Sequence, residues 1–133
     1  MKEMIIIRGL PSSGKSSLAK ILASASPNSV AICSADQYFN NGGAYKFDKD
    51  CLKDAHAYCK HKAHYECTNG TQLVIIDNTN TTKKEYQYYV DIANHFGYNV
   101  RSIIVETTHS NKNDHNVPDE TVQKMKRRFK VNL

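Results

Sequence analysis

Short apolar runs alternate with segments of helical periodicity along most of the chain. The runs lack the polar alternation of half-exposed strands, which is typical of strands buried on both faces of a sheet. They lie at residues 4–7, 30–33, 73–77 and 99–106. The predicted helices comprise residues 15–24, 48–67, 82–96 and 119–130. This order predicts an α/β fold, a three-layer sandwich with a short parallel sheet of about four strands and helices on both faces.

Turn-forming residues mark the ends of these predicted elements. Pro27 follows the first helix, Gly70 follows the second, and Gly97 is a predicted C-cap of the third. The polar, glycine-containing segment 40–43 predicts a loop. No repeat or linker-like tract divides the sequence, so we expect residues 1–133 to form one domain.

Residues 9–16 match the phosphate-loop pattern G-x-x-x-x-G-K-[ST] in full. The motif follows a predicted strand and opens a predicted helix, the context in which such a loop surrounds phosphates. Gly9 and Gly14 allow the backbone to turn its N–H groups inward. Lys15 is expected to reach the β- and γ-phosphates, and Ser16 to bind Mg²⁺. The sequence therefore predicts a site for ATP or another nucleoside triphosphate. The residues expected to hold it are Gly9, Pro11, Ser12, Ser13, Gly14, Lys15, Ser16 and Ser17.

Two carboxylates follow predicted strands, at the edge where parallel sheets bind their ligands. Asp77 closes the run 73–77 in the place of a Walker-B acid, and we expect it to complete a Mg²⁺ site with Ser16. Asp36 lies just beyond the run 30–33, where a carboxylate can accept the proton of an attacking hydroxyl. A helix N-cap is the other interpretation, because Asp is favoured there and either Ser34 or Asp36 can start a short helix. The residues alone leave both interpretations open.

Further segments follow the order of motifs in a known family. They are residues 9–17, 33–39, 45–48, 55–56, 76–81 and 115–118. The phosphate loop is generic, but Asp36, the Asp-Asn-Thr-Asn run at 77–80 and the late Val117-Pro118 are more specific. On these motifs the sequence resembles the P-loop polynucleotide-kinase family, and in particular its small animal and viral kinase-like branch.

The resemblance implies a P-loop kinase-like fold and transfer of the γ-phosphate of ATP to a hydroxyl. In the phage enzyme of this family the acceptor is the 5′-hydroxyl of a nucleic acid. By the same resemblance Lys15 and Ser16 hold the triphosphate and metal, Asp36 is the general base, and a lid lies at about residues 107–117.

The sequence departs from the family at two arginines. The arginine expected three residues after the base is Phe39, and the lid arginine is Lys112, which supplies charge without a bidentate fork. Arg127 or Arg128 can supply missing charge, so Lys112 and Arg128 join Lys15 and Asp36 as candidate catalytic residues. Because the chain ends soon after the last predicted helix, we expect the adenine base to be held loosely or with the help of a second copy.

Three weaker patterns have competing interpretations. Five potential metal ligands on one predicted helix are His56, Cys59, His61, His64 and Cys67. No pair has zinc-finger spacing, and the two cysteines share the apolar face, so we predict core packing. The basic run 124–130 is either a track for a phosphate backbone or a solvated helix face. Aromatic residues near Asp36 either stack a base or pack inside, and they are Tyr38, Phe39, Tyr45 and Phe47.

The amino-acid composition and the net charge exclude some classes of protein. Hydrophobic residues make up 40% of the 133 positions and charged residues 23%, so a packed core is expected. The longest apolar run, residues 4–7, is far shorter than the roughly 20 residues of a membrane span. The four isolated cysteines indicate reduced thiols in an intracellular protein, either cytoplasmic or nuclear. A net charge of +5 favours a polyanionic partner.

These patterns favour an ATP-dependent kinase that acts on a hydroxyl of a nucleic acid. Two alternatives remain, a kinase of small molecules or modified bases on the same fold, and a nucleotide-binding adaptor that has lost catalysis. The adaptor is disfavoured because the residues needed for phosphoryl transfer are intact. Those residues are Lys15, Ser16, Asp36 and Asp77.

Overall fold

A parallel sheet lies at the centre of the computed structural model, which describes residues 1–11, 13–41, 44–45, 48–106, 120 and 123–125. Within these residues the strand order is β2-β5-β1-β6. The strands are β1 Glu3–Arg8, β2 Val30–Cys33, β5 Leu73–Asp77 and β6 Asn99–Ile104. All pairs in this sheet are parallel, which confirms the predicted α/β arrangement.

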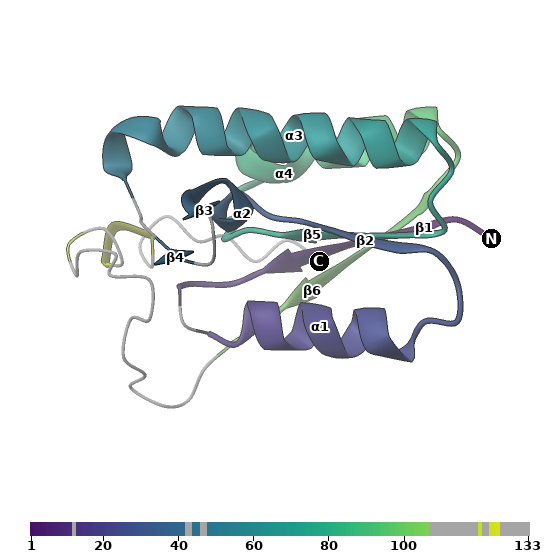
Figure 1. Ribbon diagram of the computed structural model, residues 1–133, viewed down its shortest axis with the longest axis horizontal. Coiled ribbons are helices and arrows are strands. Elements are labelled where there is room, and N and C mark those ends of the chain that lie inside the picture. Colours follow the sequence, from purple (N-terminus) through teal and green to yellow (C-terminus); the bar gives the residue numbers. More distant parts are fainter. Residues whose placement is uncertain (12, 42–43, 46–47, 107–119, 121–122, 126–133) are drawn as a thin grey trace.

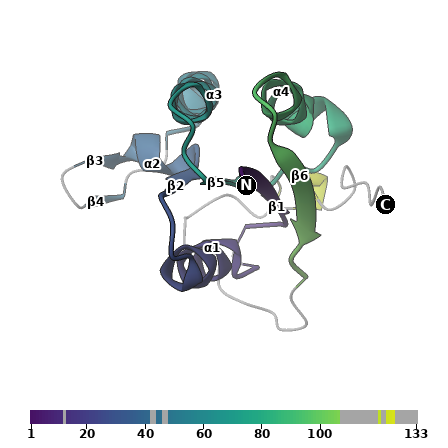
Figure 2. The same cartoon turned by 90° about the vertical axis from the view of Figure 1, so that its right-hand side faces the viewer.

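Helices cover both faces of the sheet. Helix α1 (Lys15–Ala25) covers one face, and α3 (Leu52–Thr68) and α4 (Lys83–His95) lie side by side on the other (Figure 2). The carboxyl ends of the strands share one edge with the short helix α2 (Asp36–Phe39) and with the start of α3 (Figure 1). Residues that follow the strands are therefore brought together at this edge.

Two predicted segments differ in the structure. The predicted loop at 40–43 is wrong in part, because β3 (Asn40–Asn41) pairs antiparallel with β4 (Ala44–Tyr45). Two-residue strands are too short to produce a recognisable hydrophobic pattern. The helix predicted from residue 48 begins with the 3-10 turn η1 (Lys49–Cys51), whose N-cap Asp48 accepts a hydrogen bond from the amide of Asp50. The proposed lid at 107–117 lies outside the described residues, as does most of the last predicted helix, of which residue 120 and residues 123–125 are helical.

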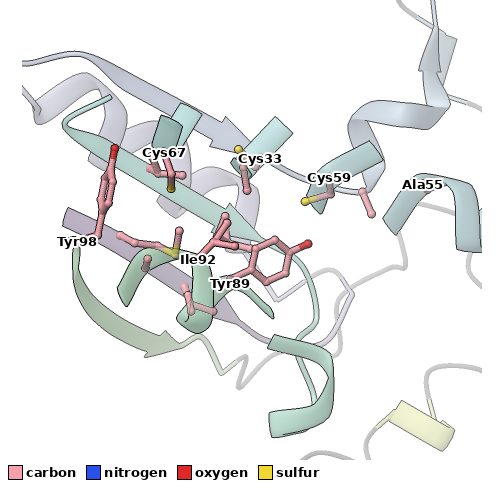
Figure 3. Packing of buried hydrophobic residues seen from close by; sticks show 14 of the residues in the cluster. Cys33, Ala55, Cys59, Cys67, Tyr89, Ile92 and Tyr98 are labelled. Carbon is pink, nitrogen blue, oxygen red and sulfur yellow. The ribbon is translucent and has the colours of Figure 1, made fainter. Parts of the chain in front are cut away.

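The main core lies between the sheet and the pair α3 and α4 (Figure 3). The predicted apolar face of α3 is confirmed, since Ala55, Cys59, Ala63 and Cys67 are all buried. His61 and His64 are exposed, and the described residues contain no group of three His, Cys, Asp or Glu side chains that could hold a metal ion. Core packing, as predicted, accounts for Cys59 and Cys67.

None of the described helices combines the length and the apolar character that crossing a membrane requires. The core is instead made of side chains buried between layers. Ile76 of β5 is completely buried, whereas Ile21 on the outer face of α1 keeps 64% of its surface exposed. The two isoleucines therefore provide a matched pair of sites.

Replacing Ile76 by Ala is expected to lower the free energy of unfolding by about 2–5 kcal/mol, because the substitution leaves a cavity in the core. The change Ile21→Ala should alter it by less than about 0.5 kcal/mol. Urea unfolding of both variants measures the two values. Equal losses would contradict the assignment of Ile76 to the core.

The thiols should differ in reactivity with iodoacetamide. Burial raises the pKa of Cys33 to about 12 and that of Cys67 to about 11, and burial also raises the pKa of Cys59. A raised pKa lowers the thiolate fraction at pH 8. Burial and the charge of Asp48 raise the pKa of Cys51 as well, so the expected order also depends on access to the sulfur. The three buried thiols should react at least about 100-fold more slowly than half-buried Cys51. Mass spectrometry after timed alkylation measures this order, and alkylation in guanidinium should abolish it. Rapid native labelling of Cys33 would contradict the buried core.

Candidate active site

The phosphate-loop motif joins the end of β1 to the start of α1, as its sequence context predicts. The amide of Gly9 donates a hydrogen bond to the carbonyl of Thr79, 3.0 Å away, which fixes the loop to the end of β5. A Cβ atom at Gly9 would lie 2.7 Å from Ser13 Oγ and 2.8 Å from the carbonyl oxygen of Val105. Gly14 has a φ of +100°, a conformation that L side chains rarely adopt. Both glycines are thus required by the backbone.

Two polar side chains of the loop, Ser13 and Lys15, are at least partly shielded from solvent. The Ser13 side chain is buried, and its hydroxyl has no hydrogen-bond partner among the described residues. Lys15 Nζ donates to the carbonyl of Leu10 at 3.0 Å. Burial lowers the pKa of Lys15, and the negative charges of Asp77 and Asp36 oppose this shift. A buried, unsatisfied hydroxyl beside a half-buried ammonium fits a phosphate group, which accepts hydrogen bonds and carries negative charge.

The remaining predicted loop residues are placed less deeply. Pro11 is half-buried, Ser17 is exposed on the first turn of α1, and Ser12 lies outside the described residues.

Ser16 and Asp77 meet as predicted. Ser16 Oγ donates a hydrogen bond to Asp77 Oδ2 over 3.1 Å. Asp77 keeps only 6% of its surface exposed at the end of β5, and Ser16 lies in the first turn of α1. A hydroxyl and a carboxylate oxygen at this separation suit the hard-oxygen chemistry of Mg²⁺, so the two side chains fit the predicted metal site.

Asp36 lies in the first turn of α2, and other side chains cap that helix. The Ser34 hydroxyl accepts a hydrogen bond from the Asp36 amide at 3.0 Å. Asn78 Oδ1 accepts from the Ala35 amide at 2.8 Å, and Gln37 Oε1 accepts from the Ser34 amide at 3.2 Å. The N-cap residue is Ala35. A short helix thus starts at Asp36 and Ser34 accepts from its first amide, as the second interpretation expects, but the N-cap position itself is Ala35 and not Asp36.

A buried arginine next to the loop was not found from the sequence. Arg8 is fully buried at the end of β1, where its Nε donates to the carbonyl of Asn80 at 2.8 Å. A second nitrogen donates to the carbonyl of Thr81 at 3.2 Å, and the guanidinium lies over the ring of Tyr86. Arg8 thereby holds the segment after β5 against the phosphate loop. The sequence feature that could have indicated this role is a charged residue that directly follows the apolar run 4–7 and precedes Gly9.

The structure describes only some of the other candidate residues near the site. Phe39 is 5% exposed and belongs to the main core, so its position in α2 faces away from solvent. Lys112 and Arg128 lie outside the described residues, and so does most of the basic run 124–130. Of the aromatic residues near Asp36, Tyr38 is 41% exposed, whereas Phe47 and the side chain of Tyr45 are not described.

A second feature of this edge is a cavity of about 440 Å³ between α3, α4 and the segment after β5. It is lined by His56, Lys60, Asn80, Thr82, Lys84 and Glu85. Sequence reasoning did not bring these residues together, because they come from three separate segments.

The residues match a family of known proteins. The family model described as AAA domain matches residues 4–131. Human NEDD4-binding protein 2 is 38% identical over 97 residues, which cover 73% of this chain and 5% of that protein. The chain thus spans a small part of that curated relative's length. This likeness agrees with the resemblance drawn from the motifs.

Solved structures share the fold at low sequence identity. The structure of Chaetomium thermophilum Kti12 in complex with ADP-AlF3 has a TM-score of 0.67 at 16% identity, and the match covers 96% of this chain and 80% of that one. The Pnkp1/Rnl/Hen1 complex has a TM-score of 0.61 at 19% identity, with coverage of 92% and 38%. The P-loop kinase-like fold is thereby confirmed.

The change Gly9→Ala should weaken ATP binding by at least about tenfold, since the added methyl group meets a backbone oxygen that cannot move aside. Titration with a fluorescent ATP analogue measures the dissociation constant. The double change Gly9→Ala with Ser13→Ala removes only the flexible contact and should recover little affinity, with Ser13→Ala alone as the control. Full recovery in the double variant would contradict the role assigned to the Val105 carbonyl.

Proposed function

The chain belongs to the AAA domain family, and from that premise we propose that it is an ATP-dependent phosphotransferase acting on the 5′-hydroxyl of a nucleic acid. The observation that carries the proposal is the position of Asp36. Asp36 opens α2 just after β2, at the edge of the sheet where β1 leads into the phosphate loop, and its negative charge opposes the lowering of the Lys15 pKa by burial. A carboxylate at the same edge of the sheet as the phosphate loop is suited to act as the general base for a hydroxyl that attacks there.

The proposed reaction uses groups already at this edge. The acceptor oxygen attacks the γ-phosphorus of ATP and forms a new O–P bond, while the bond from that phosphorus to the β–γ bridging oxygen breaks. The acceptor proton passes to the Asp36 carboxylate, and ADP leaves. The Lys15 ammonium stabilises the negative charge on the transferred group. Mg²⁺, when bound by Ser16 and Asp77, supplies further positive charge to the phosphate oxygens.

Three observations support a nucleic acid as the acceptor. The chain carries a net charge of +5, which favours polyanions. The rings of Tyr38 and Tyr58, which are 41% and 40% exposed, lie 6.0 Å apart on α2 and α3 and offer a surface on which a base can stack. The fold is also shared with the Pnkp1/Rnl/Hen1 complex.

A kinase of small hydroxyl compounds is the second candidate. The cavity of about 440 Å³ favours it, because this volume is within the usual range for small-molecule sites. Phosphoryl transfer to a nucleoside or sugar in preference to an oligonucleotide would select this candidate.

The change Asp36→Asn should lower phosphoryl transfer from labelled ATP to a 5′-hydroxyl oligonucleotide by at least about 100-fold, since an amide cannot accept the proton. The measurement is the initial rate of labelled product formation. ATP affinity, measured by titration, should change by less than about threefold, because the phosphate loop is retained.

Asp54→Asn is the matched control, because Asp54 is an exposed aspartate on α3 that does not line the cavity. It should keep the wild-type rate. Equal rates for wild type and Asp36→Asn would remove Asp36 as the base. ATP binding without transfer to any hydroxyl acceptor would support an adaptor instead.

A further inference from the structure

The cavity between α3 and α4 is built into the same edge as the phosphate loop. Asn80, which forms part of its wall, has a positive φ of 48° and donates from Nδ2 to the carbonyl of Ile7 at 3.0 Å. Arg8 holds the carbonyls of Asn80 and Thr81 from the other side. These contacts fix the wall of the cavity to the strand that leads into Gly9. The cavity and the triphosphate site thus have a fixed relative position.

Two lysines contribute positive charge to the lining of the cavity. Lys60 and Lys84 are both exposed, and neither forms an ion pair with any carboxylate of the part of the chain that the structure describes. Lys60 Nζ lies 5.4 Å from the centre of the Tyr88 ring, a contact that orients the ammonium without neutralising it. Two positive charges from two helices therefore face one cavity.

The carboxylate of Glu85 also lines the cavity, where it accepts hydrogen bonds from neighbouring groups at the start of α4. Glu85 accepts hydrogen bonds from the amide of Thr81 and from the hydroxyls of Thr81 and Thr82. These bonds hold it against the start of α4. Burial lowers the pKa of His56 and the charge of Lys60 acts in the same direction, whereas Glu85 and Asp36 raise it. The cavity thus offers two ammonium groups and an imidazole N–H as donors.

We propose that this cavity binds a phosphate group of the acceptor, so that the acceptor is a phosphate-bearing hydroxyl compound, such as a nucleotide or the end of a nucleic-acid strand. The inference rests on the proposed phosphotransferase function and names the part of the acceptor that is recognised. Lysines from two helices provide charge-assisted hydrogen bonds to a tetrahedral anion. Asp36 then meets the hydroxyl on the side of the phosphate loop.

The test compares two acceptors that differ by a phosphate. The dinucleotide ApA carries one phosphodiester next to its 5′-terminal nucleoside, and adenosine carries none. In the double variant Lys60→Ala with Lys84→Ala, the ratio of kcat/KM for ApA to kcat/KM for adenosine should fall at least about tenfold. Substitution of both lysines by Arg should retain most of the ratio, since the charge is kept.

A matched control comes from the same two helices. Lys53→Ala with Lys83→Ala removes two exposed lysines of α3 and α4 that do not line the cavity, and it should leave the ratio unchanged. A fall of similar size in this control would indicate a general effect of surface charge. An unchanged ratio in the Lys60 and Lys84 variant would overturn the proposal. Thermal unfolding of every variant verifies that each is folded.

A binding measurement distinguishes a wrong phosphate site from a wrong proposed function. Titration of the protein with ApA and with adenosine, followed by NMR without ATP, reports recognition independently of turnover. Weaker ApA binding in the Lys60 and Lys84 variant supports the phosphate site even if no transfer occurs. Normal transfer to ApA with unaltered ApA binding in that variant would overturn the site while the kinase proposal stands.

Discussion

The parallel pairing of β1 with β5 is the contact on which the rest of the active edge depends. Its register places Ile7 opposite Asp77, two residues before Gly9. One pairing therefore brings the phosphate loop, the acid at the end of β5 and the segment 78–82 to the same level of the sheet. A shift of one residue would move every side chain of one strand to the opposite face of the sheet and would separate Ser16 from Asp77.

The strands and helices near this contact were predictable because their hydrophobic patterns are strong. Each apolar run became a strand, and the loop at 9–16 occurs where its motif requires. The β3–β4 hairpin was missed because its strands are two residues long. Arg8 was missed for a different reason. Its partners, the carbonyls of Asn80 and Thr81, lie more than seventy residues away in sequence. Every residue has a backbone carbonyl, so the identity of the partner residues does not indicate this contact.

The setting of Asp36 depends on residues that are distant in the sequence. Sequence position alone cannot separate a capping carboxylate from a catalytic one, because both occur where a strand turns into a helix. In the structure Asn78 reaches from the end of β5 to the amide of Ala35, and Ser34 accepts from the amide of Asp36. The first amides of the helix thus find hydrogen-bond acceptors on the neighbouring side chains of Ser34 and Asn78.

The close approach of Gly9 to the carbonyl of Val105 has a thermodynamic consequence. β6 is an edge strand of the described sheet, and directly beyond it the amide of Val105 donates to the carbonyl of Arg8 at 2.7 Å. A ligand that favours the ordered phosphate loop must also favour this last attachment of the edge strand. By mass action, binding to the native state alone stabilises it against unfolding. Nucleotide bound at the phosphate loop would then raise the free energy of unfolding of the whole sheet, its edge strand included.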